Sequence, residues 1–289
     1  MSWANCEDIY DRLDRLGEYE TVSTFSLAYY DAIAEYVAGG GRAGQGLRLR
    51  LVEFFEVMEQ YHRALHVFSV EDQVTLGNVR AAAQRRDVGL QVLLEQLHVD
   101  RTHGDAETAR LLLTAECYYQ LAQIEQVVET LDCAVQAGAD HPMAFFALGY
   151  NRYELAMRTF TRYDNASGKQ VVHDEDRFRL SCLAAVSSLQ DGLSGSRLDG
   201  HLHWWIGNIL EAAGFDEAAG ASFARAEELE SNAALLEEWE EAAILLSFEI
   251  DVDSEEDGGS TSGPISEDEV DQAGLLLRLS YTQSEIMDE

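Results

Sequence analysis

The chain contains little proline and lacks long uncharged stretches, and these shortages narrow its fold class. Only Pro142 and Pro264 occur in 289 residues, so long helices can form without the kinks that proline causes. No uncharged stretch reaches the roughly 18 residues of a membrane span, and the N-terminus lacks the basic-then-apolar order of a signal peptide. Runs that alternate Val, Ile or Thr with polar residues are almost absent, so no sheet is predicted. We expect an all-α fold.

Sequence motifs of catalysis and of zinc binding are missing as well. The four cysteines (Cys6, Cys117, Cys133 and Cys182) are widely spaced and form no Cys-x-x-Cys pair. Three of them lie in apolar helical runs, where free cysteine acts as a small hydrophobe, which favours a reduced setting in the cytoplasm, or in the nucleus of a eukaryotic cell. Neither Gly-x-Ser-x-Gly nor His-Glu-x-x-His occurs. We therefore predict no catalytic residues, no metal and no cofactor, and interpret the chain as a protein that is not an enzyme.

The charge is strongly one-sided. The formal net charge is -33. The basic residues are nineteen arginines and a single lysine, Lys169. Such a field repels nucleic acid and anionic membranes and attracts basic segments of proteins. The composition also resembles that of proteins from salt-adapted organisms. Whether the acidity reflects a salty habitat or a basic partner therefore stays open.

A pattern of small and large residues recurs along the second half of the chain. The clearest copy runs from His203 through Ile206, Gly207 and Leu210 to Ala219, Phe223 and Ala226. Ala185, Leu189 and Gly192 stand 34 residues before its last three members, and Ala115 and Gly149 are also 34 residues apart. Val127, Leu131 and Ala134 supply the matching positions of the earliest copy. Small residues at this spacing let two antiparallel helices approach closely, and the large residues fill the space between them.

This pattern resembles the tetratricopeptide repeat, a hairpin of two helices with a period of about 34 residues. The resemblance implies a right-handed α-solenoid of three hairpins over residues 106–231, which presents a groove for a partner protein. It departs from the family at Thr114 and Arg152, where large apolar residues are expected. The clamp by which some members hold acidic C-termini needs lysines, and the first helices of these hairpins have none.

The middle repeat is interrupted. Gly149 and Gly207 are 58 residues apart, which leaves 24 residues beyond one period. Because Ala185 and Leu189 keep the register of the last repeat, the extra residues fall between the two helices of the middle hairpin, at about 157–180. Insertions in repeats often lie on the binding face. Arg158, Arg162 and Lys169 are the predicted contacts within it, and a helix extension followed by a flexible loop is the alternative.

Three regions follow from these observations. Residues 1–104 are predicted to form helices near 5–16, 21–38, 47–67, 70–86 and 88–98, some as degenerate hairpins, with the glycine run 39–46 as a flexible connector. Residues 105–249 hold the repeats and a capping helix at 232–248. Residues 250–289 carry twelve acids and one base; we predict a disordered acidic tail that ends in a short apolar segment able to dock.

The predicted binding residues are those that the repeat register places on the groove side of each first helix. They include several aromatic side chains with polar tips, which bury a large area at little entropic cost. The set consists of Tyr119, Phe146, Tyr150, Tyr153, His201, Trp204, Asn208 and Glu211. Trp205 and Ile206 are assigned to the core. A competing interpretation is that some of these residues pack against the N-terminal helices.

The first hypothesis is thus a scaffold or adaptor that binds a basic or apolar segment of another protein; its oligomeric state is not predicted. Two alternatives remain. One resembles the histone chaperones in which an acidic segment interrupts a repeat. The other is a di-metal carboxylate bundle built on Glu59-x-x-His62 and Glu95-x-x-His98, with Glu35 and Glu71 as further ligands and His66 near the first motif.

Overall fold

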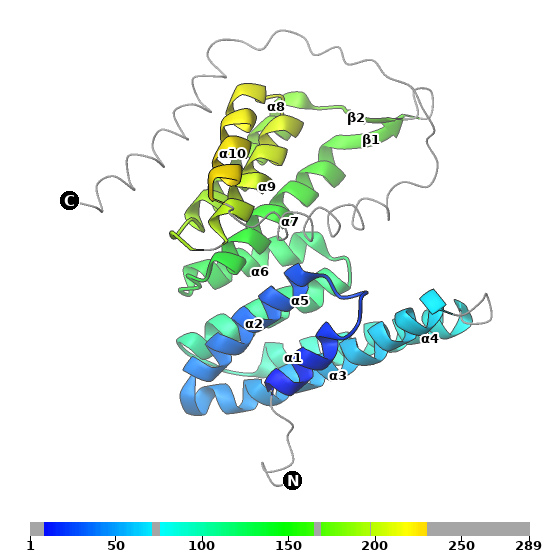
Figure 1. Cartoon of the computed structure of the whole chain (residues 1–289). Helices are drawn as coiled ribbons and strands as arrows, with labels where there is room; N and C mark the ends of the chain where they lie inside the picture. The colour runs from blue at the N-terminus through cyan, green and yellow to red at the C-terminus, as the bar shows by residue number, and fades with distance from the viewer. Residues whose placement is uncertain (1–8, 71–75, 165–168, 197, 230–289) are drawn as a thin grey trace. The chain divides into compact units, whose positions relative to one another are not determined.

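The computed structural model describes residues 9–70, 76–164, 169–196 and 198–229 (Figure 1). These residues are mostly helical, as predicted. They divide into two compact units, one ending at Ala144 and the other beginning at Phe145. The boundary near residue 104 that the sequence suggests stays a prediction. The proposed capping helix (232–248) and acidic tail (250–289) lie outside the described residues.

The first unit contains six helices and the second contains four helices and two strands, counted over the described residues. Those of the first unit are α1 (Ile9–Gly17), α2 (Thr24–Gly39), α3 (Gly41–Val70), α4 (Leu76–Val99), α5 (Asp105–Gln120) and α6 (Ile124–Gln136). The second unit comprises α7 (Pro142–Phe160), which begins just before the division, β1 (Thr161–Asp164), β2 (Lys169–Val172), α8 (Glu175–Asp191), α9 (Asp199–Ala212) and α10 (Asp216–Leu229). Within the described residues, no helix combines the length and the apolar character that crossing a bilayer requires.

The glycine run forms the start of a helix, so the predicted flexible connector is wrong. Gly41 adopts a left-handed conformation, with φ +56°, which lets α2 end and α3 begin without a loop. A Cβ on Gly44 would lie 2.4 Å from the carbonyl oxygen of Val37, and one on Gly40 would lie 2.8 Å from the Cβ of Ala106. These glycines therefore permit close packing of backbones.

The region predicted as two helices, 70–86 and 88–98, is the single helix α4. Gly89 does not interrupt it, because tertiary packing outweighs the cost of about 1 kcal/mol for glycine in a helix. A Cβ at Gly89 would lie 2.9 Å from Cγ2 of Val57 on α3. The missing side chain thus allows α3 and α4 to pack side by side (Figure 1).

Helix α2 packs along α5, through tyrosine hydroxyls that reach polar groups of distant segments. Tyr29 donates a hydrogen bond to the carbonyl oxygen of Leu112 (3.2 Å), and Tyr30 donates one to Oε1 of Glu116 (3.0 Å). Tyr36 donates to Oδ1 of Asp140 (2.6 Å). Burial raises the pKa of the Glu116 carboxyl, although hydrogen bonds from two side chains oppose the rise. Helix α2 therefore covers the face of α5 that carries Leu112 and Glu116.

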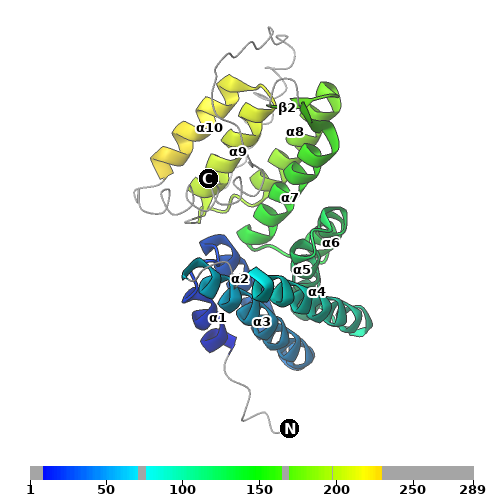
Figure 2. The same cartoon turned by 90° about the vertical axis from the view of Figure 1, so that its right-hand side faces the viewer.

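The second unit contains two close helix contacts that involve the predicted small residues. A Cβ at Gly149 of α7 would lie 2.6 Å from Cγ of Leu189 on α8. One at Gly207 of α9 would lie 2.5 Å from Cε1 of Phe223 on α10. Each glycine leaves room for the large side chain of the neighbouring helix. Helices α9 and α10 run side by side in both views (Figures 1 and 2).

The insertion contains a two-stranded antiparallel ribbon, so the prediction that the chain has no sheet is wrong. Thr161 pairs with Val172, and Asp164 pairs with Lys169. The backbone N–H of His173 donates to the carbonyl oxygen of Phe160 (2.9 Å) and closes the base of the ribbon. Figure 1 shows β1 continuing from the end of α7. The strands are only four residues each, too short for an alternating pattern to identify them.

Candidate partner-binding face

Helix α9 carries four of the eight predicted groove residues, and Asp199 fixes the loop that leads into it. Its carboxylate accepts hydrogen bonds from the backbone N–H groups of Ser194 (3.2 Å), Gly195 (2.8 Å) and Ser196 (3.2 Å). The hydroxyl of Ser196 donates a fourth, at 3.2 Å. Hydrogen bonds to a charged acceptor are stronger than neutral ones. The start of α9 is thereby held against the preceding loop.

Five aromatic side chains of α7 and α9 contact one another, and we name this set the aromatic cluster: Phe146, Tyr150, His201, Trp204 and Trp205. Phe146 stacks on Tyr150 with ring centroids 6.0 Å apart, and it lies 5.0 Å from His201. Tyr150 meets Trp205 edge to face at 5.0 Å. The two indoles are perpendicular, 5.3 Å apart. Edge-to-face and offset-stacked pairs such as these stabilise an aromatic layer beyond the area that they bury.

Three members of the aromatic cluster are buried. Phe146 is 3% exposed, His201 4% and Tyr150 8%. Trp204 and Trp205 are half-buried. The indoles therefore form the accessible part of the aromatic cluster, supported by the three buried rings.

The remaining predicted residues of the second unit lie along the same two helices. Tyr153 is half-buried on α7, and burial raises the pKa of its hydroxyl. Asn208 is half-buried on α9, where its side-chain amide donates to the carbonyl oxygen of Trp204 (2.8 Å). Glu211 is exposed. The structure thus offers two indoles, an amide and a carboxylate along α9.

Trp205 is the residue that the sequence interpretation missed. The repeat register assigns it to the core, yet it is half-buried and contacts Phe146 at 5.9 Å and Tyr150 at 5.0 Å. The sequence gives no separate signal for Trp205, because adjacent residues on a helix are about 100° apart and a register that places Trp204 on the groove side directs Trp205 towards the core.

His201 is held neutral within the aromatic cluster. Burial lowers its pKa to about 3, because the protonated imidazole loses its hydration there. Its ring stacks on Trp204 with an interplanar angle of 14°. The lowered pKa of the neighbouring His203 has the same main cause. At neutral pH the buried His201 therefore adds no charge to the aromatic cluster.

The buried state of His201 predicts acid sensitivity. An unfolded histidine titrates near pH 6.5, so between about pH 6.5 and 3 the unfolded chain binds a proton that the folded chain does not. The contribution of His201 to stability is complete above pH 6.5 and falls as the pH is lowered. Binding one extra proton in the unfolded state costs up to about 1.36 kcal/mol of stability per pH unit. Between pH 6.5 and 5, we therefore expect the unfolding free energy of wild type to fall by about 2 kcal/mol more than that of His201→Gln. Urea unfolding at the two pH values measures it.

The control for this prediction is His103→Gln, which alters an exposed histidine. This variant should keep the wild-type pH dependence. If His201→Gln also keeps it, the imidazole is not buried in a neutral form.

In the first unit, helix α2 packs on the side of α5 that would have to be open to form a groove. Tyr119 follows Leu112 and Glu116 at helical spacing on α5, and α2 contacts both of those residues through its tyrosines. Tyr119 itself is half-buried. The competing interpretation, that N-terminal helices pack on the predicted groove side, therefore fits α5 better than an open groove does.

The insertion residues lie at the end of α7 and in the ribbon. Arg158 is exposed and pairs with Glu154 one turn earlier (3.7 Å). Arg162 is exposed in β1. Lys169 lies in β2, opposite Asp164 in the register of the strands.

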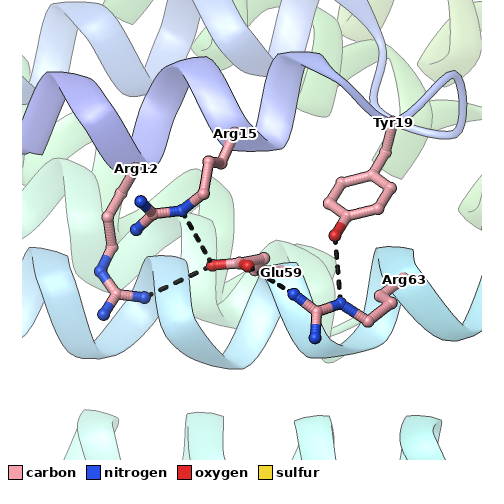
Figure 3. Close-up of polar contacts among 5 residues, drawn as sticks. All are labelled: Arg12, Arg15, Tyr19, Glu59 and Arg63. Carbon is pink, nitrogen blue, oxygen red and sulfur yellow. Dashed lines mark hydrogen bonds and ion pairs between the residues drawn. The ribbon is translucent and has the colours of Figure 1, made fainter.

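Glu59, the carboxylate of the first proposed metal motif, is engaged by arginines (Figure 3). One of its oxygens lies 3.4 Å from Nη1 of Arg12 and 3.6 Å from Nε of Arg15, both on α1. The other lies 2.9 Å from Nη2 of Arg63, whose Nε donates to the hydroxyl of Tyr19 (3.2 Å). Glu59 therefore links α1 to α3.

The histidines of the two motifs also have other partners. Nδ1 of His62 lies 3.0 Å from the hydroxyl of Thr21, and Nε2 of His98 lies 3.2 Å from that of Tyr118. Burial, with a smaller effect of the Arg86 charge, lowers the pKa of His62 to about 4. Over the part of the chain that is described, no three His, Cys, Asp or Glu side chains gather as metal ligands. Glu71, a further proposed ligand, lies outside that part.

Comparison with protein-family models, with curated proteins and with solved structures yields no match to this chain. The resemblance to tetratricopeptide repeats thus depends on the residue pattern described above.

Proposed function

We propose that this chain is a non-catalytic scaffold or adaptor of the tetratricopeptide type, which binds a segment of another protein at the aromatic cluster. The observation that carries the proposal is the pair of half-buried, perpendicular indoles, Trp204 and Trp205, above three buried rings. Tryptophans that are rigidly supported and partly accessible are frequent hot spots of protein interfaces. Their rings are already fixed, so binding costs little side-chain entropy.

The helix contacts support the repeat assignment that this proposal uses. The helices α5 and α6, α7 and α8, and α9 and α10 correspond to the three hairpins in the pattern. Gly149 and Gly207, two of its small residues, face Leu189 and Phe223 of the partner helix in the hairpin. On this proposal the hairpins form a right-handed solenoid, with residues 232–248 as the cap and residues 250–289 as an acidic tail.

The expected ligand is a basic or apolar segment. An apolar side chain would contact the indoles, since the interior of the aromatic cluster is uncharged at neutral pH. A basic side chain would pair with Glu211 on the exposed side of α9. The net charge of -33 disfavours nucleic acids and anionic membranes as partners. The proposed setting is the reduced interior of a cell.

The test is capture of partner proteins from lysate by wild type and by Trp204→Ala, followed by affinity measurement with the recovered segment. We expect Trp204→Ala to weaken binding by about tenfold or more, the usual loss at a hot spot. Glu211→Arg alters an exposed side chain without disturbing the fold, and should weaken binding of a basic segment and leave a purely apolar one unaffected.

The matched control is Leu180→Ala on α8, where the leucine is 65% exposed. It should bind as wild type does. Equal binding by wild type, Trp204→Ala and Glu211→Arg would exclude the aromatic cluster as the site. Recovery of histones would instead favour the chaperone alternative.

A further inference from the structure

Helix α4 presents a stripe of exposed apolar residues. Val88 is 65% exposed, Val92 49% and Val99 79%. The opposite side of the helix is buried through Leu90, Leu93 and Leu97, which are at most 3% exposed. Large apolar side chains gathered on one solvent-facing stripe mark an interaction surface.

The stripe has the spacing of a coiled-coil seam. The three valines, extended by Ala81, Arg85 and Glu95 on the same side of α4, follow one another in alternating steps of four and three residues: Ala81, Arg85, Val88, Val92, Glu95 and Val99. We keep the name stripe for these six residues. This spacing keeps the residues on one side of a helix that packs along another helix. Two members are charged, with opposite signs, and both are exposed.

We propose that α4 pairs with α4 of a second copy of this chain, antiparallel and centred between Val88 and Val92. In this arrangement Val88 of each copy meets Val92 of the other. Arg85 meets Glu95, so two ion pairs of opposite charge form about the two-fold axis. Ala81 meets Val99 at each end. The stripe is thus complementary to itself, as an isologous dimer interface must be.

The charges select this pairing over the alternatives. A parallel pair in register would place Arg85 against Arg85 and Glu95 against Glu95, and like charges in contact are unfavourable. One flank of the seam is exposed and carries neither acidic residues nor arginines; its residues are Gln84, Gln91 and His98. This flank therefore adds no repulsion between two copies. A second copy therefore fits the stripe without a further partner.

The dimer is expected to be weak. One helix pair with three valines from each copy covers less than the roughly 1,200 Å² at the lower end of specific interfaces. Both copies also carry a large negative charge, which salt must screen. At about 0.15 M salt the Debye length is near 8 Å. Repulsion between distant charges of the two copies is therefore largely screened, whereas the ion pairs between Arg85 and Glu95 still attract. We expect association in the micromolar range.

A charge swap in the full chain tests the proposal. Arg85→Glu or Glu95→Arg alone places like charges in contact twice in each dimer, and should weaken dimerisation by about tenfold or more. The double variant R85E/E95R restores both pairs and should recover the wild-type dissociation constant within about threefold. Residues ten apart on one helix do not touch, so only pairing between copies explains the recovery. Sedimentation equilibrium measures all four chains.

Two further variants complete the experiment. Val88→Glu should abolish the dimer, and Leu180→Glu, an equally exposed site on α8, should leave it intact. Circular dichroism checks that each variant keeps its helices. A wild type that stays monomeric up to the highest concentration reached would overturn the proposal. So would a dimer that survives Val88→Glu, or one that the double swap fails to restore.

Discussion

Replacing Gly149 by alanine is expected to destabilise the second unit by about 2 kcal/mol, although alanine forms helices better than glycine does. The new Cβ would lie 2.6 Å from Cγ of Leu189 and 2.9 Å from the carbonyl oxygen of Ala185. The backbone oxygen cannot move aside independently, so α7 and α8 must separate. Overpacking of this kind costs about 3 kcal/mol, which exceeds the gain of about 1 kcal/mol in helix propensity.

The control for Gly149 is Gly220→Ala in α10. Apart from its chain neighbours and the backbone of its own helix, no atom lies within 4 Å of a Cβ built there. This substitution gains the helix propensity without an overlap, and should stabilise the protein by about 1 kcal/mol. Chemical denaturation measures both variants. If both substitutions changed the unfolding free energy in the same direction, α7 and α8 would not approach each other as closely as the structure shows.

A second large loss of stability is expected when Asp199 is replaced. Asp199→Ala removes the acceptor of four hydrogen bonds and should lower the unfolding free energy by about 3 kcal/mol, because hydrogen bonds to a charged group contribute about 1.5 kcal/mol or more each. The loop can recover part of the loss by binding water. The variant should also weaken partner binding, because the indoles of α9 depend on the position of this helix.

The matched substitution for Asp199 is Asp216→Ala. Both acids lie in the first turn of a helix, α9 or α10, and interact favourably with the helix dipole. Asp216 is exposed. Its loss should cost about 0.5 kcal/mol. Thermal unfolding compares the two; equal costs would mean that the hydrogen bonds of Asp199 contribute little to stability.

The sequence predicts the helices of the second half well because their signal is local. A small residue at Gly149 or Gly207 and large residues at fixed distances follow from the geometry of two touching helices. The spacing alone therefore places Gly149 and Gly207 at contacts between helices, while the bounds of the helices are not part of that signal. The short strands β1 and β2 give no such signal, since each is only four residues long.

The contacts between segments far apart in the chain could not be predicted in the same way. Tyr29 and Tyr30 contact α5 across more than 80 residues, and no spacing rule links those positions. The glycine run 39–46 likewise reads as a connector until the close approach of α2, α3 and α5 is known. For the candidate site, the repeat register places Trp204 on the groove side and Trp205 in the core, whereas the structure leaves both indoles half-buried. The exposure of Trp205 depends on how α7 and α9 pack against each other.

We expect a partner protein to contact the exposed side of α9 beside the aromatic cluster. Photo-crosslinking from position 211 tests it most directly, with a crosslinking amino acid in place of the exposed Glu211 and, as control, of Leu180 on α8. We expect a crosslinked partner from position 211 only, lost when Trp204→Ala is added. Identical products from both positions, or a product at 211 that persists without Trp204, would contradict the account.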